Sequence, residues 1–196
     1  MNVYVVYCHP LETSITAAAR DRALTGLRTA GHQVRINDLY AENFTPELSA
    51  WERTNHLSPP DTKPAIQAYA ANLRWCEALV LVYPTWWAGQ PAMLKGWIDR
   101  VWVAGVAYEL PEGATRIRPL LPNIRRIVAV TTHGSTKFIN ALEGEGGKRI
   151  VTRSLRVLCN KRARTKWVAL YNIDRSTVDD RAAFLSRVEK AMRTLR

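Results

Sequence analysis

The sequence predicts an α/β protein with a doubly wound, five-stranded parallel sheet in the strand order 2-1-3-4-5 and helices on both faces. Short apolar runs alternate along the chain with longer segments at helical spacing, as repeated β-α-β units require. The run at residues 3–8 lacks the polar alternation of a half-exposed strand, so both of its faces should be covered. No repeat or linker interrupts the pattern. We therefore expect residues 1–196 to form one domain.

The individual elements follow from these runs and from the residues that end them. Strands are expected at residues 3–8, 33–38, 78–83, 125–132 and 164–172, and helices at residues 15–30, 62–76, 91–101, 148–159 and 177–195. Thr13 or Ser14 is the expected N-cap of the first helix, and Gly31 its stop. Pro91 is expected at the first position of the third helix. The long segment 39–60 contains three prolines and is expected to be a lid or an interface arm.

Composition limits the classes of function. Of the 196 residues, 47% are apolar and 23% are charged, which excludes a disordered chain. Lys and Arg number 28 against 17 Asp and Glu, a formal charge of +11. Such a surplus favours an anionic partner, whether nucleic acid, a membrane surface or a phosphorylated small molecule.

The cysteines and the apolar runs indicate the compartment. Cys8, Cys76 and Cys159 are odd in number and widely spaced, without a CxxC motif. This pattern argues against a disulfide framework and a cysteine-based zinc site, and no metal is expected. The first residues lack the features of a signal peptide, and no apolar run approaches the roughly 18 residues of a membrane helix. We expect a cytoplasmic protein.

Three loops should meet where the strand order reverses, because ligands of such sheets bind outside the carboxyl ends of the strands. They are residues 8–16, 83–91 and 131–135. The first has neither a GxGxxG nor a Walker A motif, which disfavours a Rossmann dinucleotide site and a P-loop nucleotidase. Its hydroxyls at a helix N-terminus suit an anion such as phosphate, although they also suit simple capping.

The second loop is more specific. It carries Trp86 and Trp87, then Gly89 and Pro91. Gly89 is expected to need an open φ or a close backbone approach, so this loop could border a planar heterocycle. The alternative is that both indoles fill the core or a dimer interface. The third loop has Gly134 between hydroxyl residues, which suits either ring oxygens or an ordinary turn.

Taken together, the loops resemble the NAD(P)H:quinone oxidoreductase family, which are flavoproteins of the flavodoxin-like fold. The most specific part is the run YPTWWAGQPAMLKGWIDRV at residues 83–101, followed by GVAY at residues 105–108. His9-Pro10 with Thr13-Ser14 looks like the phosphate loop of the family. The similarity keeps order and spacing from residue 1 to residue 135, and beyond that it is limited to the plan of strands and helices.

The resemblance implies a bound flavin, either FAD or FMN, in a ping-pong two-electron transfer of hydride from NAD(P)H to a quinone-like acceptor. It also implies a homodimer with the site at its interface. The cofactor-binding residues it implies are His9, Thr13, Ser14, Ile15 and Thr16 on the phosphate side, and Pro84, Thr85, Trp86, Trp87, Ala88, Gly89, Thr131, Thr132, His133 and Gly134 along the ring. Tyr108 would border the acceptor pocket.

The chain departs from the family pattern in three places. Thr16 replaces a frequent Asn, and His133 replaces a Gly. Residues 138–147 lack the Tyr and His by which some members relay charge to the reduced flavin. No catalytic acid or base is required, since the flavin carries the bond chemistry. His133 and Tyr108 are the only candidates for a catalytic role. His133 is expected to favour its protonated form beside a reduced, anionic flavin; the alternative is that its imidazole points to solvent or to the dimer partner and only fills space.

A basic tract supports rival functions. Residues 148–166 contain eight Lys and Arg and no acidic residue. The tract suits a solvated helix face, the attraction of NADPH, or an acidic partner, whereas nucleic acid is disfavoured. A regulatory flavoprotein subunit of a membrane transporter would share the same motifs, which leaves peripheral membrane contact open.

Overall fold

The predicted parallel sheet is present in the computed structural model, which describes residues 1–58 and 63–196. Its order is β2-β1-β3-β6-β7, and every neighbouring pair is parallel. The strands are β1 (Asn2–Tyr7), β2 (Gln33–Asp38), β3 (Ala78–Pro84), β6 (Arg126–Thr132) and β7 (Arg164–Leu170). Renumbered along the chain, this is the predicted order 2-1-3-4-5, and each end lies within two residues of its predicted place. The predicted fold class is therefore confirmed.

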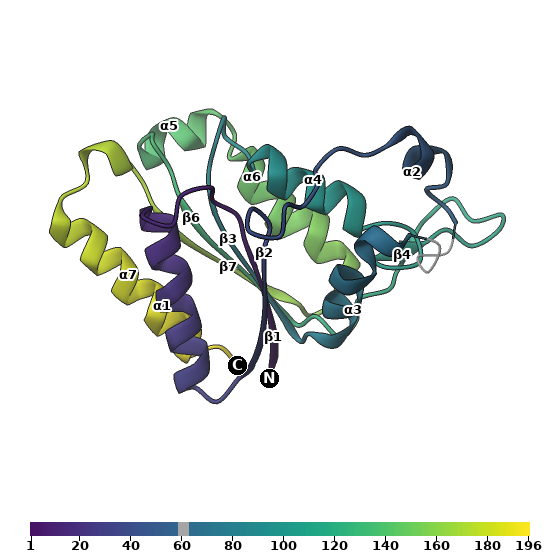
Figure 1. Cartoon of the computed structure of the whole chain (residues 1–196), viewed down its shortest axis with the longest axis horizontal. Helices are drawn as coiled ribbons and strands as arrows, with labels where there is room; N and C mark the ends of the chain where they lie inside the picture. Colours follow the sequence, from purple (N-terminus) through teal and green to yellow (C-terminus); the bar gives the residue numbers. More distant parts are fainter. Residues whose placement is uncertain (59–62) are drawn as a thin grey trace.

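Helices cover both faces of the sheet (Figure 1). Two long helices, α1 (Ile15–Thr29) and α7 (Val178–Arg193), lie together on one face. The opposite face carries α3 (Gln67–Trp75), α4 (Ala92–Val101) and the helical segment 146–158. Strand side chains alternate between the two layers, so that Val3 packs with α1 and α7 whereas Tyr4 packs on the other face. Both faces of the central strands β1, β3 and β6 are buried, which is why these strands are mostly apolar, whereas the edge strand β2 is polar and largely exposed.

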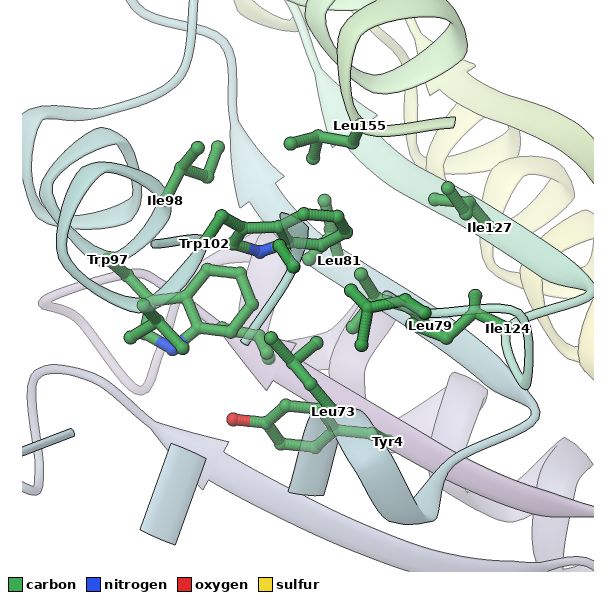
Figure 2. Close-up of a cluster of buried hydrophobic side chains, with 14 of the residues drawn as sticks. Tyr4, Leu73, Leu79, Leu81, Trp97, Ile98, Trp102, Ile124, Ile127 and Leu155 are labelled. Atoms are coloured by element: carbon green, nitrogen blue, oxygen red, sulfur yellow. The ribbon is translucent and has the colours of Figure 1, made fainter. Parts of the chain in front are cut away.

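Tryptophan fills much of the second layer (Figure 2). Trp97 of α4 is fully buried, and its ring centroid lies 6.2 Å from that of Tyr4 and 6.4 Å from that of Trp102, both edge-on. Leu79 and Leu81 of β3 complete the contact with the sheet. Two of the seven tryptophans thus serve the core rather than a ligand.

The helix ends refine the predicted caps. Ser14 caps α1, because its hydroxyl accepts a hydrogen bond from Ala17 N at 3.1 Å. Gly31 follows α1 with φ +73°, a left-handed conformation that favours glycine. Pro91 occupies the N-cap of α4, not its first helical position, because its ψ of 150° is extended. The prediction for Pro91 was wrong by one residue.

Short elements appear that the sequence patterns did not predict. They are α2 (Ala50–Thr54), the hairpin of β4 (Tyr108–Glu109) and β5 (Arg118–Pro119), α5 (Lys137–Leu142) and the 3₁₀ turn η5 (Ile173–Arg175). A second 3₁₀ turn, η2 (Pro64–Ile66), precedes α3. The predicted start of that helix at Thr62 lies outside the described residues.

The basic helix predicted at residues 148–159 is a composite. It consists of α6 (Gly146–Arg149), a π-helical stretch η3 (Ile150–Leu155) and a 3₁₀ turn η4 (Arg156–Leu158). The arm 39–58 that carries α2 lies against α4. A Cβ on Gly96 of α4 would collide with the backbone of Pro46, so only glycine permits this approach. In the described part of the chain, no helix is long and apolar enough to cross a membrane.

Candidate functional site

The three predicted loops meet around a cavity of about 860 Å³ at the carboxyl edge of β1, β3 and β6. Twelve of the fifteen predicted binding residues line it, namely His9, Ser14, Ile15, Thr16, Pro84, Thr85, Trp86, Trp87, Ala88, Thr132, His133 and Gly134. The other three, Thr13, Gly89 and Thr131, do not. The lining residues that were not predicted are Leu11, Ser135, Asn140, Glu143, Ile173 and Asp174.

The first loop presents a helix N-terminus to the cavity. The Ser14 hydroxyl accepts a hydrogen bond from Ala17 N. The N–H groups of Ile15 and Thr16 have no carbonyl partner within the helix, because they belong to its first turn. Thr16 is buried against this end, whereas Thr13 is exposed. Glu12 is the acidic residue of the loop, and Arg20 binds both of its carboxylate oxygens, at 2.9 and 3.1 Å. The loop can therefore receive an anion without facing a free carboxylate of its own.

His9 links the first loop to the second. Its Nδ1 accepts a hydrogen bond from Leu11 N at 3.0 Å, and its ring lies 6.4 Å from that of Trp86. Partial burial lowers the pKa of His9 below its ordinary value, so a neutral ring is favoured. An accepting Nδ1 places the proton of that neutral ring on Nε2.

The second loop is a tight turn closed at both ends. Trp86 N donates to Gly89 O at 3.1 Å, and Gly89 N donates to Trp86 O at 3.0 Å. The two central residues, Trp87 and Ala88, have φ values of +48° and +57°. This is the geometry of a type I′ turn, which normally carries Asn-Gly, and the side chain of Trp87 is wholly exposed.

The predicted role of Gly89 is only partly right. Its φ is not in the left-handed region, which instead falls on the two residues before it. The close approach exists, but to the chain itself. A Cβ on Gly147 would lie 3.1 Å from Gly89 Cα, and Gly147 N donates to Ala88 O at 2.9 Å. The turn is thus held from behind by the start of α6.

The second and third loops are hydrogen-bonded to each other. Thr85 N donates to Thr132 O at 2.7 Å, which extends the pairing of β3 with β6 by one residue. The hydroxyls of Thr85 and Thr131 lie 2.9 Å apart. Thr131 is buried, and its hydroxyl contacts Thr85. Thr131 therefore packs behind the wall of the cavity instead of lining it.

His133 is enclosed by protein. It is 6% exposed, and its Nδ1 lies 2.7 Å from Asn140 Oδ1. The Asn140 amide nitrogen donates to the carbonyls of Thr136 and Ser135, at 2.8 and 3.3 Å. Its oxygen therefore faces His133 and accepts from an Nδ1–H. The other nitrogen, Nε2, keeps its lone pair and lies 3.4 Å from Thr85 Oγ1.

The protein around His133 favours a neutral ring. Burial lowers its pKa below the ordinary value, against the hydrogen bond to Asn140, which raises it. The ring also stacks on Tyr171 at 4.5 Å with an interplanar angle of 21°. The imidazole does not point to solvent, and its charge beside a reduced flavin stays a prediction. Asn140 escaped prediction because it lies on α5, seven residues away, and belongs to no motif.

Tyr108 lies apart from the cavity within this chain. It belongs to β4 and borders a separate cavity of about 250 Å³ with Leu48, Glu52, Arg100 and Trp102. The expectation that Tyr108 borders the acceptor pocket is therefore not met by a single copy of the chain.

The residues that line the cavity include acidic side chains but no Lys or Arg. The acidic residues are Glu143 and Asp174. Donors come instead from the backbone of the three loops, where the N–H groups of Trp87, Ala88 and Gly134 have no acceptor in the described part of the chain. The groups that the cavity offers to an anion are therefore a helix N-terminus and backbone amides rather than side-chain cations.

A doubly wound sheet with a helix N-terminus and an aromatic turn around a cavity at its switch point defines a class. It is that of doubly wound α/β proteins, whose ligand sites usually lie at the carboxyl edge of the sheet. The chain belongs to the flavodoxin-like fold family, whose family model matches residues 1–194.

Known proteins resemble the chain at moderate identity. NAD(P)H dehydrogenase (quinone) 1 of Rattus norvegicus is 31% identical over 160 residues, 73% of this chain and 57% of the relative. An uncharacterised NAD(P)H oxidoreductase of Escherichia coli is 37% identical over 111 residues, 54% of this chain and 55% of the relative. The chain thus spans little more than half the length of these curated relatives. The solved structure of NAD(P)H:quinone oxidoreductase from Methanothermobacter marburgensis superposes with TM-score 0.81 at 26% identity, covering 98% of this chain and 96% of that one.

Proposed function

We propose that the chain is a flavin-dependent oxidoreductase that transfers hydride from NAD(P)H to a quinone-like acceptor. The observation that carries the proposal is the assembly of three separate loops around one cavity. At about 860 Å³ the cavity is within the usual range of small-molecule and cofactor sites. The names of the quinone reductases among its relatives support the same activity.

The residues present fit a flavin with its phosphate at α1. The N-terminus of α1, with Ser14, Ile15 and Thr16, would hold the phosphate through backbone N–H groups and a hydroxyl. The turn at Trp87 and Ala88 and the third loop would border the ring. When bound, the flavin supplies a carrier that accepts hydride from one substrate and delivers it to the next.

The side chains have supporting tasks. Backbone N–H groups of the second and third loops can stabilise negative charge on the ring edge, as donors do in an oxyanion hole. Thr85 fills the wall between these loops, with its hydroxyl shared between Thr131 and His133. Neutral His133 has both nitrogens engaged, so it orients this wall and is not required as an acid or a base.

A second copy of the chain would complete the site. Large apolar residues are exposed on the α2 arm and beyond the neighbouring β4 strand, namely Leu48, Trp51, Leu57, Leu110 and Ile117. The cavity that contains both Leu48 and Tyr108 shows that the arm and β4 adjoin. The exposure of these apolar residues supports the expected homodimer through this face, which would bring Tyr108 to the cavity of the partner.

The test combines identification of the cofactor with a matched pair of variants. Mass spectrometry of material released by heat should detect FAD or FMN, and the protein should oxidise NADH or NADPH in the presence of a quinone. Ser14→Ala should weaken flavin affinity about tenfold or more, since a hydrogen bond to a charged group contributes about 1.5–3 kcal/mol. Thr13→Ala, one residue away but outside the cavity, should bind as the wild type does. A protein that neither retains FAD or FMN nor takes up either one would contradict the proposal.

A further inference from the structure

The outer edge of β7 has no strand beside it in the described sheet, because β7 is last in the sheet order. Leu170 O accepts from His133 N at 2.8 Å, and Arg164 N donates to Arg125 O at 3.1 Å. The even-numbered residues of β7 therefore turn their amide groups toward β6. Residues at the odd positions, such as Trp167 and Ala169, direct theirs outward, and an edge of this kind can accept another strand. The Ala169 carbonyl accepts a hydrogen bond from the Arg187 side chain at 3.0 Å, which an added strand would replace.

A groove of about 530 Å³ runs along this edge. Its lining cations come from α5, α6, β7 and α7, and they are Lys137, Lys148, Lys166, Arg187 and Lys190. No Asp or Glu is among the lining residues. Lys148 is paired with Glu145 at 2.7 Å, whereas the other four have no ion pair in the described part of the chain. Positive charge therefore lies on both sides of an open strand edge.

The two aromatic residues of the groove pack against other aromatic side chains of the protein. Tyr171 stacks on His133 at 4.5 Å, and Trp167 packs edge-on against Tyr83 at 6.5 Å. Single-stranded nucleic acid relies on free aromatic faces for stacking of its bases. The groove instead offers backbone hydrogen-bonding groups flanked by cations, which matches an extended polypeptide.

We propose that the groove along β7 binds an extended acidic segment of a partner protein as an additional strand of the sheet. Its main chain would pair with the outward amides of β7, as in other cases of β-strand addition. Its Asp and Glu side chains, at every second position, would share one face of the added strand and meet either the cations of α7 or those of α5 and α6 there. β7 has seven residues, so the matching segment is short.

The first test uses a fluorescein-labelled (Glu-Val)₄ peptide and fluorescence anisotropy. Two further versions carry N-methyl groups on all the Glu or on all the Val residues, which blocks one edge of the extended chain at a time. One N-methylated version should lose binding and the other should keep it. Equal binding of both versions would show attraction by charge alone and would overturn the proposal. Displacement of the peptide by an equal concentration of oligothymidylate of the same charge would also overturn it, in favour of a nucleic-acid site.

Two double variants with the same change in charge separate the groove from the rest of the basic tract. Lys166→Glu with Lys190→Glu should weaken peptide affinity about tenfold or more, because several charge pairs are reversed at once. Lys161→Glu with Arg162→Glu changes exposed cations outside the groove and should weaken it less than about twofold. Equal losses in both variants would overturn the proposal.

Hydrogen exchange distinguishes strand pairing from attraction by charge alone, because only strand pairing protects the outward backbone N–H groups of β7. Addition of the peptide should protect the outward N–H groups of Trp167 and Ala169. The N–H of Val168, directed toward β6, should exchange as before. An unchanged pattern at Trp167 and Ala169 with saturating peptide would contradict strand addition.

Discussion

The hydrogen bond between Asn140 and His133 sets which nitrogen of the imidazole carries the proton. Residue types alone predicted a His beside the cavity, because it follows a buried strand. They could not predict its neutral state, which depends on enclosure by α5, Trp167 and Tyr171. Residue type also could not decide whether Ser14 or Thr13 caps α1, because both are good N-cap residues. The position at which the helix begins decides it.

The pKa of His133 should be measurable by NMR titration of its ring protons. It should lie below roughly 6.5, the ordinary value of histidine, because burial disfavours the cation. Lys148→Met should raise it, since this change removes a nearby positive charge and frees Glu145. Lys161→Met is the matched control and should leave it unchanged. A pKa of His133 above 6.5 in the wild type would contradict the assigned enclosure.

The lowered pKa of His133 makes the stability of the folded chain depend on pH. Between the lower pKa of the folded chain and the value of roughly 6.5 in the unfolded chain, the unfolded state binds more protons. Stability contributed by neutral His133 is therefore fully present above about pH 6.5 and is lost as the pH falls through its folded pKa.

At the scale of elements, the long strands and helices were predictable because periodicity extends over many residues. The strands of the sheet lie close to their predicted positions, and α1 begins and ends at its signals. The α2 helix, the β4–β5 hairpin and α5 were missed because each is too short for a periodic pattern. The capping box of Ser49 and Glu52 is the one signal that could have located α2.

The α2 arm is fastened to α4 by a buried ion pair. Arg100 and Glu52 are 2.7 Å apart, with side chains 8% and 11% exposed. Burial alone would raise the pKa of Glu52, but hydrogen bonds from Arg100 and Ser49 lower it below its ordinary value. The contribution of Glu52 to stability is thus present above its ordinary pKa and is lost as the pH falls through its folded pKa.

Arg100→Met should reduce the free energy of unfolding by about 3 kcal/mol or more, because it leaves a buried carboxylate without its partner. Lys95→Met removes an exposed pair with Asp99 on the same helix and should cost less than about 1 kcal/mol. Urea unfolding measures both. The deficit of Arg100→Met should shrink at acid pH, since protonation then neutralises Glu52. A deficit similar to that of Lys95→Met would contradict the anchoring role.

At the scale of the whole molecule, the chain has two faces suited to other polypeptides. One is the apolar face around α2 and β4, and the other is the basic groove at β7. The sequence predicted the basic tract but could not predict the groove, because its cations come from four elements far apart along the chain. Tyr108 shows the same limit, since its motif does not reveal that it lies outside the cavity of its own chain.

Trp51→Glu should convert the proposed dimer to a monomer of 22.2 kDa, because a charge on the apolar face opposes its burial. Sedimentation equilibrium measures the mass directly. Val178→Glu places the same charge at the start of α7, on an exposed residue outside this face, and should leave the dimer intact. A wild-type mass of 22.2 kDa would rule out the dimer at the concentration used.

The turn at Trp87 and Ala88 has a practical consequence for optical measurements. Most of the seven indoles are shielded to some extent, whereas that of Trp87 projects fully into water at the mouth of the cavity. The next residue, Ala88, accepts a hydrogen bond from Gly147 N, which holds the turn in place. The emission of Trp87 should be the most red-shifted of the seven and the first to be quenched by iodide. Trp87 therefore serves as an intrinsic fluorescent reporter for whatever enters the cavity.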